Sequence, residues 1–195
     1  MKGINWGEER FWMAFKCEPD ETLMSRIALL FNIKKQCSWE EGLANDETYF
    51  ITPRVNDWYF ITTLLLDEPE VLARDLSKVF GEVHLYGFFR SSDFVLWSIF
   101  ENGQLERYFK KSDGEINRMD GIPTVIELEL TAKYNKRISP KFKHLPDWDP
   151  VYNKERFEVL GEFEHLLMIA TSWDVSPDTL NEYEVDNFGY ILTEL

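Results

Sequence analysis

The sequence predicts an α+β protein of one domain, in which an antiparallel or mixed sheet, with a central meander at about residues 82–110, packs against two or three helices. Three observations predict this class. The pair Asn102-Gly103 lies between apolar runs and indicates a type I′ hairpin, because both residues tolerate a positive φ. Apolar residues recur at helical spacing near 21–31, 68–80 and 154–172. The length of 195 residues suits one domain.

The first part of the chain is expected to alternate strands with short helices. Aromatic and β-branched residues gather at 10–17 and 58–64, which predicts two strands. Between them, apolar side chains share one face of a predicted helix at 21–31, and Ser38 precedes a second, short helix.

The helix at 68–80 has the best-marked ends in the chain. Asp67 can cap its beginning, and Pro69 is tolerated in the first turn. Gly81 suits the left-handed conformation that ends many helices.

The hairpin turn sets the expected register of the meander. It places Trp97 opposite Tyr108 and Ser98 opposite Arg107. One face is then expected to collect Val83, Leu85, Phe89, Phe94, Leu96, Phe100, Leu105 and Phe109. The other face is expected to collect His84, Tyr86, Phe88, Val95, Trp97, Ile99 and Tyr108. That second set is too apolar to face water, so a helix should cover it.

Beyond the meander, the segment 111–124 is polar and predicts a connection. The run "TVIELEL" at 124–130 alternates apolar and polar residues, which predicts a strand with Glu127 and Glu129 on a polar face. The segment 133–150 is basic and contains two prolines, so it is expected to form an irregular loop.

The end of the chain combines a helix, a corner and a last strand. The segment 169–180, "IATSWDVSPDTL", follows the helix predicted at 154–172 and is similar to the middle of a helix-turn-helix. The residues after the turn are acidic and include no Lys or Arg, which disfavours DNA reading. A local explanation is a corner in which Ser176 caps a short helix and Trp173 packs on the core. The tail at 190–195 is expected to dock as a strand.

The charge balance bears on possible partners. The chain has 35 acidic and 21 basic residues, a net charge of −14. This charge argues against nucleic acid and anionic membrane surfaces as partners and favours a basic protein. The sequence contains no apolar run long enough to span a membrane and no signal-peptide core, so we expect a cytoplasmic protein. The sequence leaves its oligomeric state open.

Familiar catalytic and metal motifs are missing from the sequence. Cys17 and Cys37 have no neighbouring Cys or His at metal-ligand spacing, so free thiols are expected, without a metal site. His84, His144 and His165 stand outside nucleophile motifs. There is no nucleophile elbow, phosphate-binding glycine loop or dinucleotide fingerprint, so no cofactor is expected.

The candidate binding residues are Tyr86, Trp97 and Tyr108, on the aromatic face of the predicted meander, and Arg107, which the predicted register places beside Ser98 on the opposite, apolar face. Buried Tyr and Trp side chains are common anchors of protein interfaces. An arginine on an apolar face usually needs a carboxylate partner or an edge position, and Arg107 could therefore form a structural ion pair or bind a ligand. An alternative function is that of a hydrolase or transferase that uses Arg107 with nearby carboxylates, although no catalytic residue is assigned.

A resemblance covers residues 57–180 and rests on "DWYFITTLL", "DLSKVFGEVHLYGFFRSSDFVLWSIFENGQLERYF", "GIPTVIELEL" and "LLMIATSWDVSPDTL". In order and spacing these segments resemble a group of uncharacterised bacterial proteins. The style of the chain, small and acidic with Trp-rich strands, is similar to that of immunity proteins that neutralise secreted bacterial toxins. With the charge and the missing catalytic motifs, it leads us to expect a non-catalytic protein that binds a basic partner.

Overall fold

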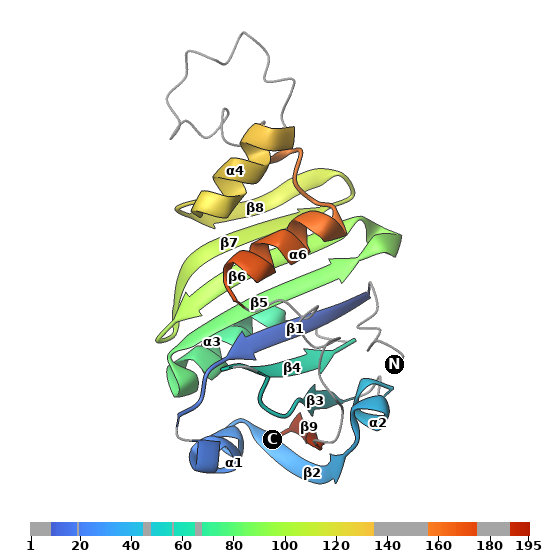
Figure 1. The fold of residues 1–195 in the computed structure, drawn as a ribbon, viewed down its shortest axis with the longest axis vertical. Helices are drawn as coiled ribbons and strands as arrows, with labels where there is room; N and C mark the ends of the chain where they lie inside the picture. The colour runs from blue at the N-terminus through green and yellow to red at the C-terminus, as the bar shows by residue number, and fades with distance from the viewer. Residues whose placement is uncertain are drawn as a thin grey trace, which may run out of the picture.

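The computed structural model describes residues 9–18, 20–44, 48–55, 57–64, 68–134, 156–174 and 188–195. One antiparallel sheet of nine strands dominates it, in the order β2-β9-β3-β4-β1-β5-β6-β7-β8. Figure 1 shows the sheet from β2 at the bottom to β8 near the top. The strands are Glu9–Phe15 (β1), Phe31–Cys37 (β2), Tyr49–Ile51 (β3), Tyr59–Thr63 (β4), Glu82–Phe89 (β5), Phe94–Glu101 (β6), Gln104–Ser112 (β7), Glu115–Gly121 (β8) and Gly189–Glu194 (β9).

Helices pack on both faces of the sheet. They are Leu23–Ile27 (α1), Trp39–Leu43 (α2), Pro69–Phe80 (α3), Val125–Tyr134 (α4) and Phe163–Ser172 (α6). Apolar residues of α1 and α3 join one core layer, on what we call the α3 face. Residues of α2, α4 and α6 join the other layer, on what we call the α4/α6 face. In Figure 1, α4 and α6 lie in front of the sheet and α3 lies behind it.

The α+β class and the antiparallel sheet are confirmed, but the emphasis on a helix-packed meander was wrong. The expected meander is present as β5, β6 and β7. It continues into β8 on one side, and β1 joins it to the remaining strands on the other. The fold is therefore dominated by its sheet, because aromatic strands from both ends of the chain extend the same hydrogen-bonded surface.

Sequence signals located the beginning of α2 and both ends of α3. Helix α3 begins at Pro69 and is followed by Gly81, whose φ of 92° is positive but whose ψ of −83° lies outside the left-handed helical region. Helix α2 follows Ser38, whose Oγ accepts a hydrogen bond from the Glu41 N–H at 3.2 Å. Asp67, the expected cap of α3, lies outside the described residues.

The turn at Asn102-Gly103 forms as predicted, whereas the hairpin between β5 and β6 turns through a 3-10 helix at Arg90–Ser92 and not through a two-residue turn. Asn102 and Gly103 have φ values of 49° and 83°, and Glu101 pairs with Gln104 across the turn. In the other hairpin, Phe89 lies opposite Phe94. Each strand of that hairpin contributes the predicted side chains to the predicted face.

The register predicted between β6 and β7 was wrong by one residue beyond the turn. Ile99 lies opposite Arg107, and Ser98 lies opposite Tyr108, because a β-bulge adds Glu106 to β7. Since side chains alternate along a strand, the extra residue exchanges the faces of the residues beyond it. Tyr108 therefore lies on the α3 face and Phe109 on the α4/α6 face.

The segment after the meander differs most from the prediction. Residues 115–121, expected to be a connection, form β8, and residues 124–130, expected to be a strand, begin α4. The turn between β7 and β8 is Asp113-Gly114, with φ values of 52° and 76°. This pair has the same composition as a type I′ turn, a signal that was present in the sequence.

Two predicted helices are shorter than expected. The helix at 21–31 is α1, which ends at Ile27, and β2 already begins at Phe31. The helix at 154–172 is represented by α6, which begins at Phe163 after Gly161, a residue at a φ of 144°. The terminal strand is confirmed as β9. The loop predicted at 133–150 begins within α4, which continues to Tyr134; its remaining residues and the cap at Ser176 lie outside the described residues.

Candidate functional site

The structure places all four predicted binding residues inside the protein. Tyr86, Trp97 and Tyr108 are fully buried, and Arg107 is 1% exposed. Tyr86, Trp97 and Arg107 lie on the α4/α6 face, whereas Tyr108 lies on the α3 face. They therefore do not form one aromatic surface.

Arg107 is joined to Glu127 by a buried ion pair. Its Nη2 lies 2.6 Å from Glu127 Oε1, and its Nε lies 3.0 and 3.1 Å from the two carboxylate oxygens. Its Nη1 donates to the backbone oxygen of Asp120 at 2.8 Å. The guanidinium also lies 5.7 Å from the ring centroid of Phe157. Every nitrogen of this guanidinium thus has a protein partner.

Glu127 gathers further donors around its carboxylate. Trp97 Nε1 donates to Oε1 at 2.8 Å. The backbone N–H and the hydroxyl of Thr124 donate to Oε2 at 2.7 and 2.8 Å. The Trp97 indole is held in place by stacking on Phe109, with ring centroids 4.0 Å apart. We call Arg107, Glu127, Trp97 and Thr124 the Arg107 network.

The start of α4 explains why Glu127 points into the protein. Thr124 precedes the helix and Glu127 is its third residue, so a carboxylate here can accept the free N–H of the residue before the helix. The spacing Thr-x-x-Glu is a sequence signal for such a start, and it was overlooked because the alternation of "TVIELEL" favoured a strand. Once the helix forms, the same carboxylate lies over β6 and β7, where it meets Arg107.

The Arg107 network is suited to holding the fold together. Two charges removed from water are stable only when hydrogen bonds satisfy them, as they do here. The network joins β6, β7, β8 and α4 at one point. A substrate would have to displace one of these partners to reach the guanidinium.

A second polar group lies on the same face, at the beginning of β5. His84 Nε2 lies 2.5 Å from Glu82 Oε1, and His84 Nδ1 lies 3.4 Å from the Tyr86 hydroxyl. The His84 ring meets Trp58 and Trp173 edge-on, each with ring centroids 5.3 Å apart. Both ring nitrogens are thus within reach of internal partners, which leaves neither free to act as a general base on a substrate.

The pKa values of this second group follow from its surroundings. The hydrogen bond from His84 lowers the pKa of Glu82, which keeps its carboxylate ionised. Burial raises the pKa of Tyr86, which keeps its hydroxyl protonated. Trp173, predicted to pack the corner on the core, does so against His84 and Tyr86.

Tyr108 has separate partners on the α3 face. Its hydroxyl donates to Glu70 of α3, and Arg118 lies over its ring, 4.4 Å from the centroid. Burial, followed by the neighbouring Glu70 carboxylate, raises the pKa of Tyr108, so the phenol stays neutral. Tyr108 therefore fastens α3 to the sheet.

The described residues also bear on metal, thiol and membrane chemistry. Within the described part of the chain, no group of three or more His, Cys, Asp or Glu side chains could hold a metal ion. Cys17 and Cys37 are buried free thiols, and burial raises the pKa of Cys37. None of the described helices is long and apolar enough to cross a membrane.

The surface of the protein carries exposed apolar side chains and exposed carboxylates. Among the large apolar side chains, Ile122, just before α4, and Val125, its first residue, are 85% and 71% exposed. Exposed carboxylates without a hydrogen-bond or ion-pair partner among the described residues include Glu106 and Glu129. Comparison with protein-family models, with curated proteins and with solved structures found no match to this chain.

Proposed function

We propose that this chain is a cytoplasmic, non-catalytic binding protein that captures a basic partner protein, in the manner of immunity proteins that neutralise toxins. The proposal rests on a difference between the contacts of the basic and of the acidic side chains. Most described cations are committed to internal contacts, whereas many carboxylates face solvent alone. The net charge of −14 is then expressed at the surface, where it attracts and orients a basic protein.

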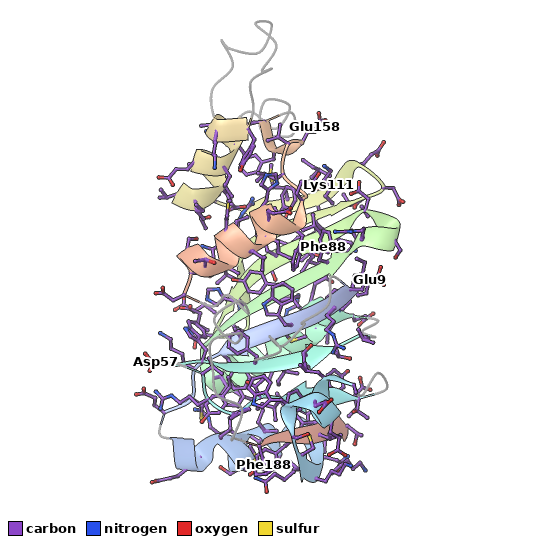
Figure 2. All side chains as sticks on the ribbon, turned by 45° about the vertical axis from the view of Figure 1, so that its right-hand side comes forward. Glu9, Asp57, Phe88, Lys111, Glu158 and Phe188 are labelled. Atoms are coloured by element: carbon purple, nitrogen blue, oxygen red, sulfur yellow. The ribbon has the colours of Figure 1, made fainter. Side chains whose placement is uncertain are left out.

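The cations make three kinds of internal contact. Some donate to backbone oxygens: Arg10 to Leu43, and Lys111 to Glu158 and Leu160. Figure 2 labels Lys111 and Glu158, which lie in the upper part of the view. Others form ion pairs: Arg54 with Asp57, Lys78 with Asp75, and Arg118 with Asp120. A third group lies over aromatic rings: Lys16 over Trp58, Lys110 over Phe94, and Lys133 over Tyr134.

Among the described residues, the side chains best suited to catalysis are also committed internally; His144 lies outside this part of the chain. Arg107 is held by Glu127, and His84 by Glu82 and Tyr86. His165 Nδ1 accepts the backbone N–H of Glu162 at 3.4 Å. These contacts favour a binding function over the hydrolase or transferase alternative, because general acid–base work requires a group that can reach the substrate.

The proposal is tested by capture followed by reconstitution. The full chain is immobilised, and proteins of the native host are applied at low and at physiological salt. We expect one basic protein to be retained, and the purified pair to bind with an affinity that falls as salt rises. Expression of that protein alone should be harmful, and co-expression of this chain should restore growth.

Two results would contradict the proposal. Repeated capture that yields no basic protein would show that the expected basic partner does not exist. If the affinity of the purified pair does not depend on salt, recognition is not based on charge. A toxin reading frame directly upstream of the encoding gene would give the first protein to purify for the test.

A further inference from the structure

Helix α4 has an inverted pattern of burial at its beginning. Glu127 is fully buried, whereas Val125 is 71% exposed and Ile122, just before the helix, is 85% exposed. A helix on a sheet normally buries its apolar side chains and exposes its charges. The arrangement here needs a cause, because burial of a valine or isoleucine side chain is worth about 1.5–3 kcal/mol.

The cause is the Arg107 network. At 3.6 residues per turn, positions two apart lie about 200° apart around a helix. Burial of Glu127 therefore directs Val125 to the opposite side. Because the Glu127 carboxylate is held by Arg107, Trp97 and Thr124, the helix cannot rotate to bury Val125 without breaking a buried ion pair.

Two exposed acidic residues, Glu106 and Glu129, lie close to Ile122 and Val125 along the backbone. Glu129 is one helical turn after Val125 and is also exposed. Glu106 is exposed as well, and its backbone oxygen packs against Gly121, the residue before Ile122. Nearby cations have internal partners: Arg118 is paired with Asp120, and Lys133 lies over Tyr134. An apolar centre with a charged rim is the usual anatomy of a protein interface.

The edges of the sheet are less suited to a partner. Both edge strands contain a bulge, at Lys34 in β2 and at Asn117 in β8. Lys35 follows the first bulge and Arg118 follows the second. Bulges and charged side chains are features that prevent another strand from adding to an edge. Side-chain docking is therefore favoured over strand addition.

We infer that Ile122 and Val125, bordered by Glu106 and Glu129, form the surface on which the basic partner docks. We call these four residues the α4 patch. This inference rests on the proposed function and adds the location and the chemistry of the contact. The partner presents an apolar side chain flanked by lysine or arginine, so that Ile122 and Val125 are covered while the carboxylates meet cations.

The test uses the full chain, labelled with ¹⁵N, and three short synthetic peptides. The first alternates lysine with leucine, the second lysine with serine, and the third glutamate with leucine. Chemical-shift changes of the backbone amides locate binding, and titration gives the affinity. The double variant Ile122→Ser/Val125→Ser removes the apolar centre. The control variant Leu29→Ser/Leu195→Ser removes two other exposed apolar side chains, which are 63% and 74% exposed.

We expect the lysine–leucine peptide to shift residues 121–129 and to bind at least about tenfold more weakly to Ile122→Ser/Val125→Ser, a change of about 1.4 kcal/mol. The control variant should bind like the original chain. Both variants should unfold at the same urea concentration as the original, because the substituted side chains are exposed.

Four outcomes would contradict either the α4 patch or the proposed function. Shifts centred elsewhere, unchanged affinity in Ile122→Ser/Val125→Ser, or equal binding of the lysine–serine peptide would overturn the α4 patch while leaving a basic partner in place. Equal binding of the glutamate–leucine peptide would contradict the charge selectivity on which the proposed function depends.

Discussion

Arg107 and Glu127 form a buried ion pair with two-point contact, in which Nη2 lies 2.6 Å from Oε1 and Nε lies within 3.1 Å of both carboxylate oxygens. This pair sets the orientation of α4 on the sheet, because it holds Glu127 of α4 against Arg107 of β7. The sequence predicted a carboxylate partner for Arg107, and Glu127 is that partner. The local sequence pattern had placed Glu127 on the polar face of a strand.

Removing one member of this pair should be much more harmful than replacing both. Arg107→Met leaves the Glu127 carboxylate buried without a cation, and we expect a loss of about 3–5 kcal/mol in the free energy of unfolding. Arg107→Met/Glu127→Leu should lose less than the sum of the two single variants. Urea unfolding measures each value. Additive losses would show that the two side chains act independently.

Ser98→Ala should leave stability unchanged or raise it by up to about 1 kcal/mol. The Ser98 hydroxyl is fully buried on the α3 face and has no hydrogen-bond partner among the described residues, so its removal ends a desolvation cost. Ser77→Ala is the matched control, because Ser77 Oγ accepts from the Gly103 N–H and donates to the Arg74 carbonyl, both at 2.8 Å. The control should lose about 1 kcal/mol. Equal losses in thermal unfolding would show that Ser98 is satisfied.

Stability should fall as the solution becomes mildly acidic, and His165 should be one cause. Burial lowers the pKa of His165. Glu162 and Glu164 oppose this change, Lys111 and Lys133 favour it, and the Tyr134 ring packs 4.6 Å away. The unfolded chain then takes up the proton at a higher pH than the folded one. The free energy of unfolding therefore declines as pH falls below about 6.5, until the folded pKa is passed.

Protonation also removes a cap of α6. The neutral Nδ1 of His165 accepts the Glu162 N–H, and the Glu162 carboxylate accepts the His165 N–H in return. His165→Gln keeps an acceptor that does not titrate. Urea unfolding between about pH 7 and about pH 5.5 should show a smaller pH dependence in this variant. An identical slope in both proteins would assign the acid sensitivity to other groups.

Two glycines with nearly the same φ should respond differently to alanine. Gly121 has a φ of 77°, and an added Cβ would lie 2.0 Å from the backbone oxygen of Glu106. Gly114 has a φ of 76°, and its nearest neighbour would be Asp93 Oδ2 at 3.9 Å. Gly114→Ala should cost about 1–2 kcal/mol from the backbone conformation alone. Gly121→Ala should cost more, since β7 and β8 must separate; equal melting temperatures would contradict the close contact.

Local sequence signals predict only part of the register of the meander. The pairs Phe89/Phe94 and Glu101/Gln104 follow directly from the adjoining turns. The bulge at Glu106 does not, because no turn residue specifies it. The bulge allows Leu105 and Tyr108 to face α3 while Arg107 faces Glu127 on the other side. This arrangement satisfies contacts with two different helices at once.

Helix α4 shows a different kind of difficulty. The alternation of residues 124–130 fits a strand, and the Thr124-x-x-Glu127 spacing fits a helix start. The helix gains from the contact between Glu127 and Arg107, which lie 20 positions apart in sequence. A pattern within seven residues cannot show that gain, so the competing strand interpretation was equally consistent with the local sequence.

The sequence by itself determined the α+β class, the turn at Asn102-Gly103, the beginning of α2, the ends of α3, and the net charge of −14, because each depends on neighbouring residues or on composition. The tertiary structure alone decided the order of the strands, with the terminal β9 between β2 and β3. It also decided that Tyr86, Trp97, Arg107 and Tyr108 are buried and that Ile122 and Val125 are exposed. These outcomes depend on contacts between distant segments, whose energies no local pattern contains.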